Sequence, residues 1–398
     1  MLTRQGWFAV VTAAVSVVAG RVLGIIELYV LGAGLALLVV LCLLWVRRVK
    51  IDMYITRDVH PLTIHAGNSA RIDLGVRNDA SRRTPVLRLR DPVAGTRGAT
   101  LNLAPLPPEA VATAAYRLPT TKRGIIEIGP LSVEVNDPLG LASARTEAAQ
   151  RVELTVYPKV EPLSPVPNSG GRDPHAGTDH PNALGRRGED FYAIRSYVVG
   201  DDIRRIHWPT TARFDDLMVR QEEMPWQGRV TVLLDVRRTA HTDDSLEEAI
   251  SAAASLVVAS WKHGDIVRLV ATDGTDTGVT PGHEHAQAVL EHLATVQAAS
   301  RGSLTSCAEA IERSPHGGGA LVIVLGRVFA DETDQLDRLR RIYSSVTVAA
   351  FLADDTAVVP PSVRLFTANT AADFATTWTA ARWQRGGVLS AAFRGGSR

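Results

Sequence analysis

The chain has 398 residues, which leaves room for two or three domains. Its 43 Lys and Arg residues balance 42 Asp and Glu residues to a net charge of +1, so no global field favours nucleic acid as a partner. The two cysteines, Cys42 and Cys307, lie far apart, which excludes a disulfide framework and a zinc-finger spacing and suits a reducing compartment.

Residues 1–50 are strongly apolar and predict a membrane anchor. Residues 28–46 carry no charged side chain. As a helix they would span about 28 Å, which is close to the thickness of a bilayer core. A shorter apolar run, residues 7–20, precedes them and can be extended to Ile26. We therefore expect a transmembrane helical hairpin with residues 7–46 in the lipid bilayer.

Basic residues after the second apolar run predict the orientation of the hairpin. Arg47, Arg48 and Lys50 follow it directly, and cationic flanks remain on the cytoplasmic side of a membrane. We expect a multi-pass protein of the cell membrane with the bulk of the chain on the cytoplasmic side. The alternative is a cleaved signal peptide with Arg4 as its basic region, and that arrangement leaves the same flank inside.

The middle of the chain predicts strands. Residues 51–160 alternate apolar and polar side chains in short runs, such as residues 70–77 and 131–135, with turn formers between them. Strands at this spacing without a helical period predict an antiparallel β-sandwich. Residues 161–187 are rich in Pro, Gly, Asn and Asp and have no periodicity, so we expect a linker there.

Residues 188–228 form an arginine-rich segment that contains no lysine. A planar guanidinium group forks onto carboxylates and stacks on aromatic rings, so the segment suits either an internal ion-pair network or a partner-binding face. The candidate partner-binding residues are Arg195, Tyr197, Gly200, Asp201, Arg204, Trp208 and Arg213.

Local structure within this segment follows from capping and from proline geometry. The aspartate pair at residues 201–202 can cap a helical turn over residues 203–207. Pro209 disfavours helical geometry at Trp208. We expect a strand at residues 217–222.

The arginine-rich segment resembles the signature of the bacterial family called domain of unknown function 58. The residues that carry the resemblance are, in order, Arg195, Tyr197, Gly200, Asp201, Arg204, Ile206, Trp208, Ala212, Arg213 and Val219. His207 and Pro209 depart from the residues usual in the family. The run Asp137-Pro138-Leu139-Gly140-Leu141 is similar to the segment that precedes the signature, although turn chemistry in a sandwich also accounts for it. The resemblance implies work in assembly or remodelling with two partners, a MoxR-type AAA+ ATPase and a transglutaminase-like membrane protein.

Residues 229–390 alternate apolar runs of strand length with helical periods. Strands are expected at residues 230–234, 266–271, 320–325 and 346–352, and helices at residues 243–263, 284–297, 305–313 and 333–343. This order predicts a Rossmann-like α/β domain with a parallel sheet covered on both faces. It is similar to the von Willebrand factor type A fold. The fold class expected for the whole chain is therefore a membrane-anchored α/β protein.

The von Willebrand factor type A fold implies a cation at the carboxyl ends of its strands, bound by Asp-x-Ser-x-Ser, a Thr and a further Asp. The positions that correspond here are Asp235, Arg237, Thr239, Thr305 and Arg327. Arginine replaces the first serine and stands near the place of the last aspartate, so charge repulsion and lost oxygen ligands both oppose a divalent ion. We expect no metal and no cofactor, and we expect Asp235 to pair with an arginine.

The sequence favours a binding role over a catalytic one. No nucleophile, base and oxyanion device occur together in a known motif. We therefore expect a non-enzymatic membrane-tethered scaffold or protein-interaction protein. The alternative is a metal-assisted hydrolase centred on Asp235 and Thr305, with Asp273 as a further acid.

Overall fold

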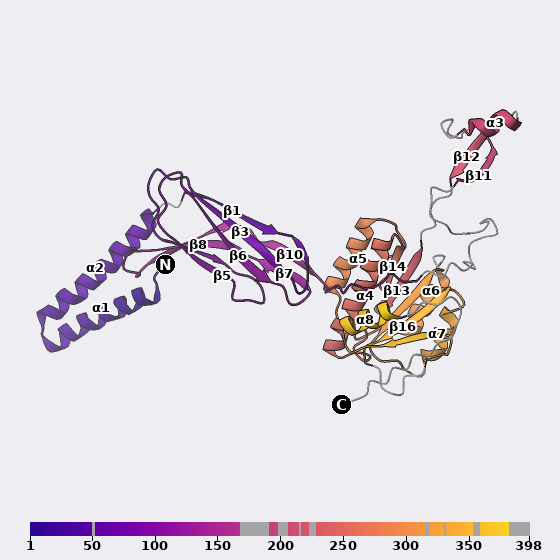
Figure 1. The fold of residues 1–398 in the computed structure, drawn as a ribbon. Helices are drawn as coiled ribbons and strands as arrows, with labels where there is room; N and C mark the ends of the chain where they lie inside the picture. The colour runs from indigo at the N-terminus through magenta and orange to yellow at the C-terminus, as the bar shows by residue number, and fades with distance from the viewer. Residues whose placement is uncertain are drawn as a thin grey trace. The chain divides into compact units, whose positions relative to one another are not determined.

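The computed structural model describes residues 1–49, 52–167, 191–197, 206–214, 216–222, 228–314, 318–329, 332–352 and 359–381. The chain divides into two units, Met1–Lys159 and Val160–Arg398 (Figure 1). The first unit holds two long helices and a set of β-sheets, and the second holds a parallel sheet with helices.

Two apolar helices open the first unit. Helix α1 (Arg4–Leu23) and helix α2 (Ile26–Arg48) run antiparallel (Figure 1) and are joined at Gly24, whose φ of 68° is the left-handed geometry that glycine accepts without strain. Both are long and apolar enough to cross a bilayer, which suggests membrane association. The two predicted helices are therefore present. The first ends at Leu23, three residues before Ile26, to which the sequence allowed it to extend.

Small residues let the two helices approach closely. Ala13, Ser16 and Gly20 of α1 and Gly32 of α2 are buried. A Cβ atom at Gly32 would lie 2.9 Å from the carbonyl oxygen of Ala13, so only glycine fits there. Close backbone approach of this kind is how apolar helices associate where the hydrophobic effect between them is weak.

The rest of the first unit forms three sheets. The first contains β1 (Met53–His60), β3 (Ser69–Asn78) and β6 (Val111–Pro119); the second contains β2 (Thr63–His65), β10 (Val152–Tyr157) and β7 (Gly124–Ile128); the third contains β5 (Ala99–Leu103), β4 (Leu87–Asp91), β8 (Leu131–Asn136) and β9 (Ser143–Ala149). Alternate residues of β3 are buried, as the sequence pattern predicts. All pairs are antiparallel except β2 with β10, which is parallel.

One buried ion pair joins the first and the third of these sheets. Arg57 of β1 donates to Asp91 of β4 at 2.9 Å, and each side chain is 1% exposed. The Tyr116 hydroxyl of β6 donates to the second oxygen of Asp91 at 2.7 Å. Burial and this hydrogen bond raise the pKa of Tyr116 well above its usual range.

The second unit contains a five-stranded parallel sheet. In spatial order the strands are β14 (Ile266–Ala271), β13 (Arg229–Leu234), β15 (Ala320–Leu325), β16 (Ser345–Ala350) and β17 (Arg364–Thr367). The strands read as nearly continuous apolar runs because both faces of the sheet are covered. The chain order reverses between β13 and β15, and in open α/β sheets such a switch point marks the place where ligands bind.

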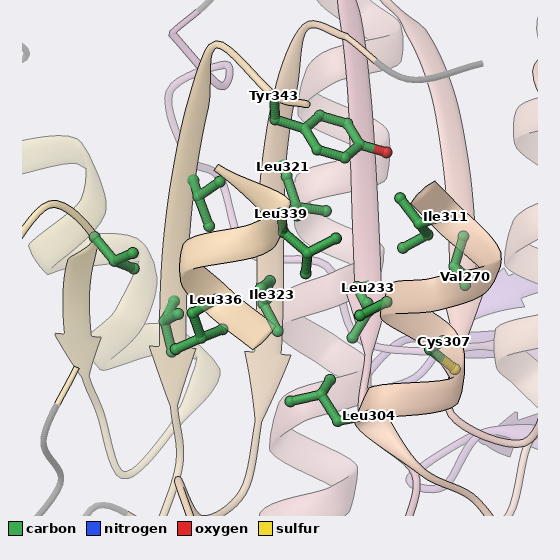
Figure 2. Close-up of a cluster of buried hydrophobic side chains, with 14 of the residues drawn as sticks. Leu233, Val270, Leu304, Cys307, Ile311, Leu321, Ile323, Leu336, Leu339 and Tyr343 are labelled. Carbon is green, nitrogen blue, oxygen red and sulfur yellow. The ribbon is translucent and has the colours of Figure 1, made fainter. Parts of the chain in front are cut away.

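Helices cover both faces of this sheet. One face is covered by helix α4 (Asp243–His263), which contacts the sheet and two further helices, α5 (His283–Thr295) and α8 (Ala371–Ala380). The other face carries α6 (Leu304–Arg313) and α7 (Thr333–Leu339). Figure 2 shows leucines of α6 and α7, such as Leu304 and Leu336, packed against the strand residues Leu233 and Ile323. The alternation of strands and helices predicted for residues 229–390 is confirmed over the described residues.

The end of one helix and the start of the linker differ from the predictions. Helix α7 ends at Leu339 and not at residue 343, because Tyr343 turns into the core, where its hydroxyl donates to Thr231. The predicted linker begins later than residue 161: the backbone of Glu161 donates to Ser255, and Val166 is buried. Residues 168–187 lie outside the described residues.

The arginine-rich segment contributes a strand pair and a short helix. Strand β11 (Phe191–Ser196) pairs antiparallel with β12 (Met218–Glu222), and helix α3 (Trp208–Phe214) lies between them in sequence. The prediction that Pro209 keeps Trp208 out of the helix was wrong, because the first turn of a helix needs no proline N–H group. The capped turn predicted at residues 203–207 lies mostly outside the described residues.

Candidate functional site

The carboxyl end of β13 carries a fully buried acid. Asp235 follows Leu234 directly, and its backbone N–H donates to Val324 of the neighbouring strand at 2.9 Å. Its Oδ1 atom accepts hydrogen bonds from the backbone and Nε of Arg237, at 3.0 and 2.9 Å, and from the Thr272 hydroxyl at 3.0 Å. Its Oδ2 atom accepts from an η-nitrogen of Arg237 at 2.8 Å. Both carboxylate oxygens are therefore engaged.

Arg237 joins Asp235 to a second acid. Its other η-nitrogen lies 2.5 Å from Glu332 Oε1, and the guanidinium carbon lies 5.5 Å from the centre of the Phe329 ring. The side chains of Arg237 and Glu332 are 13% and 8% exposed. Burial alone would lower the pKa of Arg237, but the hydrogen bonds and charges of the two acids raise the pKa above its usual range. The guanidinium therefore remains charged between two carboxylates.

Sequence reasoning missed Glu332 and Thr272. Thr272 comes directly after β14, so its place at the same edge of the sheet could have been inferred from the strand pattern. Glu332 stands 95 positions from Arg237 and directly before α7, and nothing local distinguishes it from a helix-start acid. Its Oε2 atom is buried and has no hydrogen-bond partner among the described residues.

The other predicted ligand positions do not converge on Asp235. Thr239 is exposed in the turn after β13, and Thr305 is half-buried in the first turn of α6. Arg327 is exposed, and its backbone N–H donates to Ala240. Arg237 bonds Asp235 directly, whereas no hydrogen bond or ion pair between Arg327 and Asp235 is seen in the described part of the chain.

These residues do not fit a divalent cation. The Arg237 guanidinium already bonds both oxygens of Asp235, so an ion would have to displace a charged side chain from a buried position. Within the part of the chain that the structure describes, no group of three or more His, Cys, Asp or Glu side chains could hold a metal.

A glycine after β15 allows the neighbouring loop to pack tightly against this site. A Cβ atom at Gly326 would lie 2.0 Å from the carbonyl oxygen of Ala240 and 2.7 Å from Nδ1 of His241. Burial lowers the pKa of His241, although the charge of Asp235 opposes this shift. A neutral histidine at this position adds no second cation to the site.

A hollow of about 410 Å³ lies next to this site, at the end of β14 and the start of α6. Asp273 is exposed at its rim and accepts a hydrogen bond from the backbone of Thr275, which is a turn interaction. Cys307 lines the hollow and donates to the carbonyl oxygen of Ala271 at 3.2 Å. Burial raises the pKa of the Cys307 thiol to about 11, so the thiol stays protonated at neutral pH and is a poor nucleophile.

The arginine-rich segment presents an aromatic and a cationic side chain to solvent. Trp208 is 64% exposed and Arg213 is exposed in the last turn of α3. Ile206 is buried, and Tyr197 donates from its backbone to Leu217 at 2.7 Å. Arg195 lies on β11 opposite Val219, whereas Gly200, Asp201 and Arg204 fall outside the described residues. The structure thus places four predicted residues on one small folded element: Arg195, Tyr197, Trp208 and Arg213.

Comparison with known proteins adds a family match over part of the chain. A model of the family described as "Protein of unknown function DUF58" matches residues 193–366. The uncharacterized protein YeaD of Bacillus subtilis is 27% identical over 186 residues, which is 46% of this chain and 45% of that protein. The uncharacterized protein Rv1480 of Mycobacterium tuberculosis is 25% identical over 226 residues, 54% of this chain and 63% of that protein. The chain thus spans less than two thirds of the length of each relative.

Among solved structures, the CARDB domain of the PF1109 protein from Pyrococcus furiosus matches 26% of this chain and 92% of that domain. Its sequence identity is 15% and its TM-score is 0.22.

Proposed function

We propose that this protein is a non-enzymatic, membrane-anchored scaffold whose C-terminal unit binds another protein. The observation that carries this proposal is the Asp235–Arg237–Glu332 ion-pair cluster at the carboxyl edge of the parallel sheet. A guanidinium group bridges two buried acids at the place where a von Willebrand factor type A-like fold would bind its cation. That fold is part of the proposal, and the parallel sheet with helices on both faces supports it.

A hydrolase centred on Asp235 and Thr305 is the competing function. It would need a divalent ion in place of the Arg237 side chain, which already satisfies both oxygens of Asp235. Displacing one member of a buried ion pair leaves the remaining charges unpaired, at a cost of about 3–5 kcal/mol. The contacts of Arg237 therefore favour binding over metal-assisted hydrolysis.

The membrane anchor is proposed to be a hairpin that enters and leaves on the cytoplasmic side, which makes the protein multi-pass. Trp7 and Trp45 lie near the open ends of α1 and α2, where aromatic residues mark a membrane surface. Residues ahead of α1 contact the sheets of the first unit: Thr3 donates from its backbone to Leu141 at 3.0 Å. Removal of residues 1–20 as a signal peptide would abolish this contact, so the geometry favours the hairpin.

The partner surface is proposed to be the exposed Trp208 and Arg213 on the element formed by β11, α3 and β12. Buried tryptophan and arginine side chains dominate the energy of many protein interfaces, so their exposure in the free protein suits a binding role. The resemblance to domain of unknown function 58 supplies the partner to test first, a MoxR-type AAA+ ATPase. A transglutaminase-like membrane protein is the second.

Binding of a purified MoxR-type ATPase to the full chain in lipid nanodiscs tests this proposal. We expect Trp208→Ala to weaken the affinity about tenfold or more, and Arg213→Ala to weaken it severalfold. Arg313→Ala is the matched control, because Arg313 is also an exposed arginine in the last turn of a helix of the same unit. Equal affinity of all three variants, or no binding by the wild-type protein, would contradict the proposal.

A further inference from the structure

The turn between β8 and β9 packs against the first turn of the membrane hairpin. This turn is the Asp137-Pro138-Leu139-Gly140-Leu141 run that the sequence singles out. The hydroxyl of Thr3 donates to the carbonyl oxygen of Gly140 at 2.5 Å, and the backbone N–H of Thr3 donates to Leu141. A Cβ atom at Gly6 would lie 2.0 Å from the carbonyl oxygen of Leu141, so α1 approaches the turn as closely as a glycine permits.

The same turn reaches the level of the membrane surface along α2. Leu141, Ala142 and Ala144 cluster with side chains near the end of α2, among them Cys42 and Val46. Cys42 lies three positions before Trp45, which is almost one helical turn nearer to the middle of the helix. Since tryptophans such as Trp45 sit at headgroup level, the turn lies within the interfacial layer.

The polar groups of the turn form hydrogen bonds with one another, which lowers the cost of moving the turn into the partly dehydrated headgroup layer. The buried carboxylate of Asp137 accepts the backbone N–H groups of Leu139 at 2.8 Å and Ala142 at 2.5 Å. The Asp137 backbone N–H donates to Ala142, and the Gly140 N–H donates to Asp137. Burial would raise the pKa of Asp137, but hydrogen bonds from Ala142, the Cys42 thiol and Leu139 lower the pKa below its usual value.

The exposed side chains at the tip of the turn are apolar, and exposed arginines lie at the ends of the two helices against which the turn packs. Pro138 is exposed and Leu139 is 55% exposed, although large apolar side chains in the sheets are mostly buried. Arg4 in the first turn of α1 and Arg47 and Arg48 in the last turn of α2 are also exposed. An apolar tip flanked by arginines is the combination that binds an anionic lipid leaflet.

We propose that residues 137–142 form a membrane-contacting turn, with Leu139 inserted among lipid headgroups and with Arg4, Arg47 and Arg48 facing the headgroup phosphates of an anionic leaflet. The turn thereby holds the sheets of the first unit against the membrane surface. This inference rests on the proposed hairpin, because the hairpin sets the depth of the turn.

Fluorescent labelling of the full chain in nanodiscs of phosphatidylcholine and phosphatidylglycerol tests the insertion of Leu139. An environment-sensitive dye is attached to Leu139→Cys; the native Cys42 and Cys307 are buried and react slowly in the folded protein. Leu62→Cys is the matched control, since Leu62 is 57% exposed and lies in the turn after β1, about 25 Å along that strand from the hairpin.

We expect the dye at position 139 to show a blue-shifted emission and strong quenching by lipids that carry a quencher near the headgroup. The dye at position 62 should resemble free dye in water. If the wild-type protein resists alkaline extraction from the membrane but the dye shows the same emission and quenching at positions 139 and 62, the membrane-contacting turn is overturned. Extraction of the wild-type protein by alkali would instead overturn the proposed hairpin.

Discussion

At the scale of single residues, the edge of the parallel sheet depends on one side chain, that of Arg237. A hydroxyl group after the strand-end Asp235 would be a ligand for a cation, whereas Arg237 supplies the positive charge itself. Its planar group bonds both oxygens of Asp235 and one oxygen of Glu332. The fork geometry matters here, because a lysine ammonium group is a point charge and cannot bond both acids in the same way.

Replacement of Arg237 by serine should destabilise the second unit strongly. The change leaves Asp235 and Glu332 buried without a cation, which lowers the free energy of unfolding by about 3–5 kcal/mol. Arg237→Lys should lower it less, because lysine keeps the positive charge. We expect the Tm of the full chain in detergent to fall by about 10 °C for Arg237→Ser. Arg313→Ser removes a pair whose arginine is 75% exposed and should leave the Tm almost unchanged.

Millimolar Mg²⁺ should not change the Tm of the wild-type protein, because Arg237 occupies the oxygens of Asp235. A Tm of the wild type that rises with Mg²⁺ concentration would indicate a bound ion and would favour the hydrolase.

At the scale of elements, the hairpin depends on the close approach of α1 and α2. A Cβ atom at Gly32 would lie 2.7 Å from Val17 Cγ2, whereas a Cβ atom at Gly34 would meet nothing within 4 Å. The two glycines are two positions apart on one helix, so they differ in packing and hardly in depth. Substitutions at Gly32 and Gly34 therefore distinguish the effect of helix packing from the effect of added hydrophobicity.

Gly32→Leu should separate the two helices, and Gly34→Leu should not. Overpacking of a tight contact costs about 1–3 kcal/mol, whereas an outward-facing leucine in a lipid environment costs little. We expect faster backbone hydrogen exchange in α1 of the Gly32→Leu variant and unchanged exchange in the Gly34→Leu variant. Equal exchange in the two variants would show that the helices do not pack as described.

At the scale of the whole molecule, the proposed hairpin requires the turn between α1 and α2 to face away from the cytoplasm. Ile25→Cys should therefore react with a membrane-impermeant maleimide in intact cells, because Ile25 lies in that turn. Leu62→Cys should react only after the cells are permeabilised. Labelling of Leu62→Cys in intact cells would place the sheets outside the cell and would contradict the proposed orientation. A mature chain that lacks residues 1–20 would instead support a cleaved signal peptide.

The sequence alone determined those features whose signal is local. Two uninterrupted apolar runs predict the helices α1 and α2, since helix length and hydrophobicity are properties of a short stretch of chain. Continuous apolar strands and amphipathic helices predict the alternation in the second unit. The arginine two positions after Asp235 also predicts, from the residue types alone, an acid paired with an arginine, and Arg237 bonds both oxygens of Asp235.

Only the tertiary structure decided which distant residues meet. Glu332 reaches Arg237 across 95 positions, and Thr3 reaches the turn at Gly140 across 137. Helix α8 and strand β17 were not predicted, because short elements carry weak periodic signals. Periodicity tells which face of an element is buried and leaves its partner undefined, because pairing depends on how the elements pack in three dimensions.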